Sequence, residues 1–162
     1  MTPQRELIRK RLRDEGDKLL AAFEGLTPDQ RALTIYGDGM GWSLADLLAH
    51  LASAERAFLH YGREILSGGE GAPEGFDIDA FNNREVGRLR ERGFAQTVAD
   101  FRATRQETID LVDQLSDADF ARTGRHPYFG PMSIDEMFKL IYRHNMMHLR
   151  DLRRRIGGSE HG

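Results

Sequence analysis

Apolar residues recur every three or four positions along most of the chain, the spacing of amphipathic helices that bury one face. No segment shows the strict alternation of apolar and polar residues that predicts a β-strand. The pattern predicts an all-α protein, an antiparallel four-helix bundle with short extra helical segments in its loops. The four long helical segments are expected at residues 3–24, 44–66, 77–115 (interrupted at Gly93) and 134–156.

Residues that favour helix ends lie where this pattern starts and stops. Ser43 with Asp46, and Ser133 with Glu136, have capping-box spacing, in which each side chain bonds the backbone N–H of the other residue. We therefore expect helices to begin after both serines. The helical pattern ends at residues 157–158.

The length of 162 residues fits one domain that buries a core without covalent cross-links. We expect a single bundle domain over residues 1–157 and a frayed C-terminal tail at 158–162. Because the chain has no cysteine, disulfides, thiolate metal ligands and cysteine nucleophiles are excluded.

The charge and the hydropathy of the chain suggest neither a nucleic-acid nor a membrane partner. The formal net charge is −3, and the arginines of segment 150–155 are interpreted as the end of a helix, where cations meet the negative end of the helix dipole. No stretch approaches the ~18 apolar residues of a membrane span, and the N-terminus has no signal-peptide pattern. We expect a cytoplasmic protein.

Three histidines lie on the apolar faces of predicted helices: His50 on the second, and His144 and His148, one turn apart, on the last. Each unsatisfied buried ring nitrogen would cost about 1–3 kcal/mol, and one divalent cation would satisfy three at once. Three neutral imidazoles suit Zn²⁺, Ni²⁺, Co²⁺ or Fe²⁺. The alternative is three core histidines that bond backbone carbonyls.

Two carboxylates are candidates for orienting these rings by accepting their second N–H group. Asp46 lies one turn before His50, and Asp151 lies three residues after His148. Asp46 is equally expected to cap its helix, and Asp151 to pair with a nearby arginine. His126, before the last helix, either covers the mouth of the bundle with Tyr128 or serves only the turn around it.

The chain resembles the DinB/YfiT-like family of metalloenzymes over nearly its whole length. The motifs that carry the resemblance are Trp42-Ser43-x6-His50-Leu51, His126-Pro127-Tyr128-Phe129-Gly130-Pro131-Met132-Ser133, His144-x3-His148 and Asp77-Ile78-Asp79-Ala80-Phe81-Asn82. The resemblance implies a four-helix bundle that forms a homodimer. It also implies a divalent metal held by His50, His144 and His148, with nickel or zinc preferred over iron or cobalt. Family members with known chemistry include thiol S-transferases and a mycothiol-dependent maleylpyruvate isomerase. Relatives commonly carry Asp and Gln where this chain has Asn145 and Asp151.

The leading hypothesis is a metal-dependent enzyme that transfers a low-molecular-weight thiol to a small electrophilic substrate, or isomerises that substrate. The substrate would enter near Trp42 and Tyr128, and the segment Asn82-Asn83-Arg84 is a candidate part of its pocket. No catalytic residue is assigned. The alternatives are a hydrolase whose base is Asp46, Asp151 or Glu55, a non-catalytic metal-binding stress-response bundle, and a bundle that binds no metal.

Overall fold

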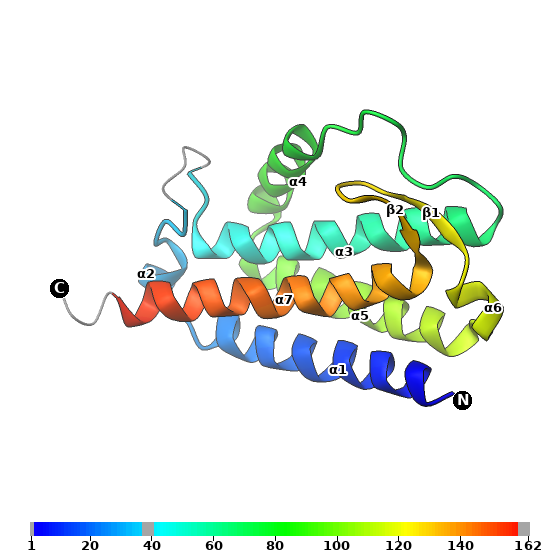
Figure 1. The fold of residues 1–162 in the computed structure, drawn as a ribbon. Coiled ribbons are helices and arrows are strands. Elements are labelled where there is room, and N and C mark those ends of the chain that lie inside the picture. Colours follow the sequence, from blue (N-terminus) through cyan, green and yellow to red (C-terminus); the bar gives the residue numbers. More distant parts are fainter. Residues whose placement is uncertain (1, 37–40, 159–162) are drawn as a thin grey trace.

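A computed structural model describes residues 2–36 and 41–158 of the chain (Figure 1). The helices are α1 (Pro3–Glu24), α2 (Pro28–Arg31), α3 (Leu44–Leu66), α4 (Ile78–Arg92), α5 (Phe94–Gln114), α6 (Asp117–Phe120) and α7 (Ile134–Gly157). Two short strands, β1 (Thr123–His126) and β2 (Gly130–Ser133), form an antiparallel hairpin before α7. The expected tail lies outside the described residues from position 159 onward.

The long helices α1, α3, α5 and α7 form a four-helix bundle, which confirms the predicted fold class. Ion pairs give the helix directions: Arg9 of α1 lies 3.3 Å from Asp113 near the end of α5, and Glu24 at the end of α1 meets Arg102 of α5. These two helices are therefore antiparallel, as are α3 and α7, whereas α3 runs parallel to α5 and α1 to α7 (Figure 1). The long connection that contains α4 returns the chain from the end of α3 to the start of the parallel helix α5.

The core of the bundle lies in two clusters of buried apolar residues. One surrounds Phe23, Leu47 and Phe101, and the other surrounds Ile8, Val112 and Phe138. These residues lie on the apolar faces of the helices, so their burial supplies the main favourable term of folding. The helix α4 packs on α3, outside the four-helix arrangement.

The predicted helix starts are confirmed. Ser43 and Asp46 form a complete capping box at α3, and Ser133 and Glu136 form another at α7. The interruption at Gly93 is also confirmed: its backbone has φ +87°, a value that favours glycine, and it separates α4 from α5.

The sequence pattern does not predict this hairpin. Each strand is only four residues long, and the two strands together contain two glycines and a proline, so no alternation is visible. Loop residues add contacts on the other side of β1, where Arg125 N–H donates to the Glu70 carbonyl at 2.7 Å and Ala72 N–H donates to the Arg125 carbonyl at 2.9 Å.

Among the helices of residues 2–36 and 41–158, none combines the length and apolar character needed to cross a membrane.

Candidate metal centre

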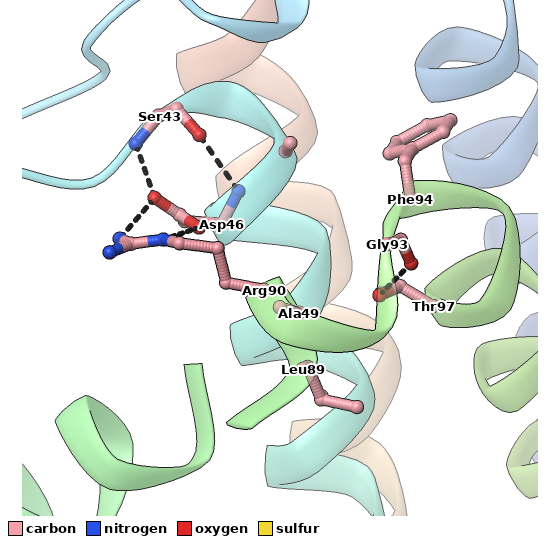
Figure 2. Close-up of a pocket in the computed structure, with 9 residues that line it drawn as sticks. Ser43, Asp46, Ala49, Leu89, Arg90, Gly93, Phe94 and Thr97 are labelled. Atoms are coloured by element: carbon pink, nitrogen blue, oxygen red, sulfur yellow. Dashed lines mark hydrogen bonds and ion pairs between the residues drawn. The ribbon is translucent and has the colours of Figure 1, made fainter. Parts of the chain in front are cut away.

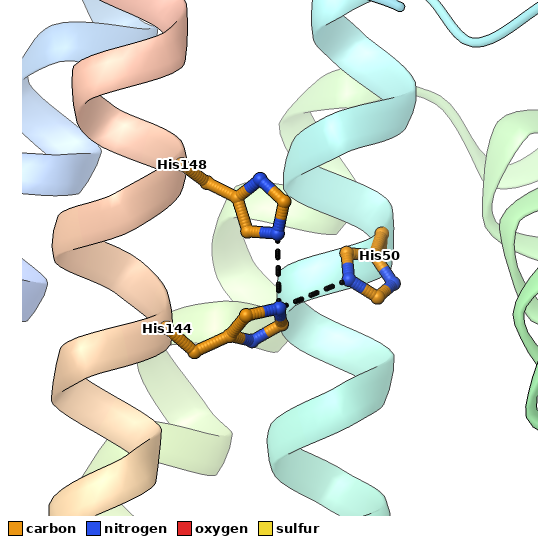
Figure 3. Close-up of side chains that lie close together, drawn as sticks. All are labelled: His50, His144 and His148. Carbon is orange, nitrogen blue, oxygen red and sulfur yellow. Dashed lines mark hydrogen bonds between the residues drawn. The ribbon is translucent and has the colours of Figure 1, made fainter. Parts of the chain in front are cut away.

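The structure brings His50, His144 and His148 together between α3 and α7, although 94 positions separate His50 from His144. Figure 3 shows the three rings pointing toward one another across the helix interface. The Nε2 atom of His144 lies 2.9 Å from Nε2 of His148 and 3.3 Å from Nε2 of His50. Three nitrogen lone pairs can therefore converge on one point.

Burial favours the neutral form of all three rings. It lowers the pKa of His50 to about 3, of His144 to about 2 and of His148 to about 4. The neighbouring His148 lowers the values of His50 and His144 further, while the Asp151 carboxylate partly opposes the shift at His148. At neutral pH the rings are uncharged, the form in which imidazole binds metals.

The donor set fits a divalent transition metal. Its ligand atoms all lie within 4.8 Å of one another. For Zn–N bonds of about 2.0–2.1 Å in tetrahedral geometry, adjacent nitrogens would be about 3.3 Å apart, so small ring movements would complete the site. Three protein ligands leave at least one coordination position for a small molecule.

Each ring has neighbours that restrict its orientation. The indole of Trp42 lies against His50 with a ring-centroid distance of 5.0 Å. The neighbouring Asn82 side chain raises the pKa of His50 and so opposes the effect of burial, although Nδ1 of His50 makes no hydrogen bond with the described residues. Nδ1 of His148 lies 2.7 Å from the hydroxyl of Tyr36, which also donates to Asp151 at 2.7 Å.

Asp46 caps α3 and pairs with Arg90. Its carboxylate accepts two hydrogen bonds from Arg90, at 3.0 and 2.7 Å, and one from the backbone of Ser43 (Figure 2). The cavity beside it is lined by α3, α4 and α5 and does not include the three histidines. Of the two readings of Asp46, the cap is therefore the one that its contacts support.

Glu55 belongs to a second buried polar cluster, which we call the Glu55–Arg105 network. Arg105 donates to both carboxylate oxygens of Glu55 at 2.8 Å, and Thr108 donates to Glu55 at 2.7 Å. The same guanidinium bonds Asn145 of α7 and the backbone carbonyl of Leu12 in α1. This network joins all four helices of the bundle next to His144, and every one of its side chains has a partner.

His126 holds the hairpin turn. Its Nδ1 accepts the backbone N–H groups of Tyr128 and Phe129 at 2.9 and 3.0 Å. This is the turn role that we considered for it. Tyr128 and Phe129 are the exposed residues at the hairpin tip.

The remaining candidates lie apart from the site. Asn83 and Arg84 are exposed, so of the segment 82–84 only Asn82 reaches the histidines. His60 is exposed on α3, and His161 lies outside the described residues.

Sequence reasoning missed Tyr36 and Arg105. Arg105 carried a signal, because it lies four residues after Phe101 and three before Thr108, on the apolar face of its helix. A charge at such a position is almost never buried without a partner. Tyr36 gave no such signal, since it lies in an irregular segment 112 positions from His148.

The family model of the DinB superfamily matches residues 11–152, so the chain belongs to that superfamily. A search of curated protein sequences found no match.

Three solved structures share the fold. YfiT from Bacillus subtilis, described as a probable metal-dependent hydrolase with an unusual four-helix bundle topology, is 21% identical with a TM-score of 0.78, covering 97% of this chain and 90% of its own. The mycothiol-dependent maleylpyruvate isomerase is 16% identical with a TM-score of 0.75; the match covers 94% of this chain and 63% of the isomerase. The colibactin self-resistance protein ClbS, solved with double-stranded DNA, is 16% identical with a TM-score of 0.69, over 94% and 98% of the two chains.

Proposed function

We propose that this protein is a metal-dependent enzyme in which His50, His144 and His148 hold one divalent transition metal. Nickel and zinc are the preferred candidates, and iron and cobalt are the alternatives. The reaction proposed is the thiol-dependent transfer to, or isomerisation of, a small electrophilic substrate. The observation that carries the metal site is the approach of three neutral, largely buried imidazole nitrogens to one point. Without a shared cation this arrangement lowers the stability of the folded protein, because buried ring nitrogens are left without hydrogen-bonding partners.

The chain's own residues would bind the metal and restrict solvent around it. His50 and His148 are only 8% and 7% exposed, and the Trp42 indole covers one side of His50. A bound divalent cation would supply a Lewis acid that lowers the pKa of a coordinated thiol. A low-molecular-weight thiol is the proposed second cofactor, because the chain has no cysteine. The mycothiol-dependent isomerase with this fold supports that choice.

Hydrolysis is the second candidate, because the YfiT structure is described as a probable metal-dependent hydrolase. A hydrolase of this kind needs a general base within reach of the attacking water. The three carboxylates put forward from the sequence are each engaged: Asp46 by Arg90, Glu55 by Arg105, and Asp151 by Tyr36. Thiol transfer needs no such base once the thiol is ionised, so we place it first.

An assay with and without added thiol separates the two reactions. Zinc- or nickel-loaded protein would be incubated with electrophilic substrates such as maleylpyruvate, and with activated esters, in the presence and absence of a thiol. Turnover that requires the thiol and is lost in His144→Ala supports the first proposal. Thiol-independent ester hydrolysis lost in the same variant supports the second, and no turnover by protein that holds one metal would support a non-catalytic metal-binding bundle.

We also propose that residues 1–157 form a single domain and that the protein is a homodimer. Its substrate is a small molecule, and it has no nucleic-acid partner. Size-exclusion chromatography with light scattering tests the dimer. Because ClbS was solved with DNA, a DNA-binding titration tests the last point.

A further inference from the structure

The contacts of Tyr36 define which nitrogen of His148 carries a proton. The Tyr36 hydroxyl oxygen lies 2.7 Å from Oδ2 of Asp151 and 2.7 Å from Nδ1 of His148. A carboxylate only accepts hydrogen bonds, and a phenol has one proton to donate. The hydroxyl therefore donates to Asp151, and its oxygen accepts a hydrogen bond from Nδ1–H of His148.

Asp151 does not orient the ring directly. Its Oδ2 is 3.7 Å from Nδ1 of His148, which is too long for a hydrogen bond. Tyr36 bridges the two groups, so the carboxylate acts on the ring only through the phenol. Since the proton of neutral His148 then lies on Nδ1, the lone pair lies on Nε2, the atom 2.9 Å from Nε2 of His144.

The segment that carries Tyr36 is fixed to both helices of the triad. Ile35 N–H donates to the Trp42 carbonyl at 3.0 Å, next to the start of α3. Arg155, in the last turn of α7, donates to the Thr34 carbonyl at 2.7 Å. The backbone that carries Tyr36 is therefore anchored to the starting segment of α3 and to the last turn of α7 by contacts that do not involve the three histidines.

We propose that Tyr36 is a positioning residue of the metal centre, which bridges Asp151 to His148 and fixes the histidine tautomer that presents Nε2 to the metal. This inference rests on the proposed metal-binding function. Partners of this kind hold the ligand in its binding tautomer and increase its basicity, and their loss typically weakens metal affinity about 10–100-fold.

The test compares Tyr36→Phe, Asp151→Ala and the double variant with the wild type. Tyr142→Phe is the matched control, since Tyr142 is a buried tyrosine of α7 that packs in the second core cluster. Zn²⁺ dissociation constants would be measured by competition with a chromophoric chelator. We expect each single variant to bind about 10–100-fold more weakly, the double variant no more weakly than Tyr36→Phe alone, and the control within about twofold.

A second readout does not require metal. Long-range ¹H–¹⁵N correlation spectra of metal-free protein report the tautomer of each histidine. We expect His148 to be the Nδ1–H tautomer in the wild type and in Tyr142→Phe, and a mixture of tautomers in Tyr36→Phe.

The outcomes separate this inference from the proposed function. If the wild type binds Zn²⁺ and Tyr36→Phe binds it equally well with an unchanged tautomer, the bridge has no positioning role. If the wild type binds no Zn²⁺, the metal site itself is wrong. An Nε2–H tautomer in the wild type would overturn the inference even if metal binds.

Discussion

Two buried polar clusters lie side by side in this bundle, and they differ in how their hydrogen-bonding groups are satisfied. In the Glu55–Arg105 network, both carboxylate oxygens and both terminal guanidinium nitrogens have protein partners. In the histidine triad, the Nε2 atoms face one another, and Nδ1 of His50 is buried without a hydrogen-bonding partner among residues 2–36 and 41–158.

This difference in hydrogen bonding indicates that the Glu55–Arg105 network is structural, whereas the histidine triad is suited to binding a ligand. A buried ion pair is stable in the folded protein when its remaining hydrogen bonds are made, as they are around Arg105. Three adjacent imidazoles have no equivalent arrangement, because two nitrogens in contact share at most one proton. Asn145 and His144 are neighbours in α7 and point in different directions, so this one helix contributes to both clusters: Asn145 bonds Arg105 of α5, and His144 meets His50 of α3.

The largest effect is expected for Arg105→Met, which leaves the Glu55 carboxylate buried without its partner. Removing one member of a buried ion pair costs about 3–5 kcal/mol of unfolding free energy, measured by urea denaturation. The double variant Glu55→Gln/Arg105→Met should recover part of the loss, because no uncompensated charge remains. A loss below about 1 kcal/mol in the single variant would show that the network is not structural.

Gly16→Ala should destabilise the protein through the same network. A Cβ at position 16 would meet the Arg105 guanidinium at a separation that requires the side chain to shift. We expect a loss of about 1–3 kcal/mol in thermal or urea unfolding, typical of overpacking. Helix propensity alone predicts the opposite sign, a gain of about 0.5–1 kcal/mol, and this gain is expected for the control Gly87→Ala, where a Cβ meets nothing within 4 Å. Equal gains in both variants would contradict the packing account.

Asp46→Asn should cost about 1 kcal/mol at neutral pH, because the cap of α3 and its pair with Arg90 lose a charge. Burial raises the pKa of Asp46, but the hydrogen bonds from Arg90 and Ser43 outweigh it and hold the value below 3.8. The ionised carboxylate therefore contributes to the unfolding free energy above about pH 4. This contribution is lost as the pH falls through the pKa that Asp46 has in the folded protein. Urea unfolding of both proteins at pH 7 and pH 3 measures this, and a pH-independent difference would argue against the charge as the cause.

His50→Leu is expected to change the unfolding free energy least. Unlike the variants above, it should not lower this free energy. In metal-free protein the change removes a buried polar ring and adds apolar packing, so the unfolding free energy should stay equal or rise by up to about 1 kcal/mol. Calorimetry in the presence of a chelator measures this. A loss of more than about 2 kcal/mol would place His50 with the structural cluster instead.

Local signals explain why the fold was predictable from the sequence. The capping boxes at Ser43 and Ser133 and the break at Gly93 act within a few residues of themselves, and the apolar period specifies the buried face of each helix. The meeting of the three histidines followed from their positions on those faces. Their role as metal ligands stays a prediction.

Contacts between distant residues were not predictable in this way. The Tyr36 hydroxyl reaches His148 across 112 positions, and Arg105 reaches Glu55 across 50. Such pairings depend on which helices become neighbours, and the parallel placement of α3 and α5 was not foreseen. The hairpin was missed because its strands are too short for any period to appear.

Metal content tests the central claim most directly. Tag-free protein purified without chelators or nickel resin would be analysed for transition metals, with His144→Ala as the control. The account predicts close to one equivalent of a single divalent metal in the wild type and its loss in the variant, both remaining folded. Metal far below one equivalent, with no uptake after addition of Zn²⁺, Ni²⁺, Co²⁺ or Fe²⁺, would contradict it.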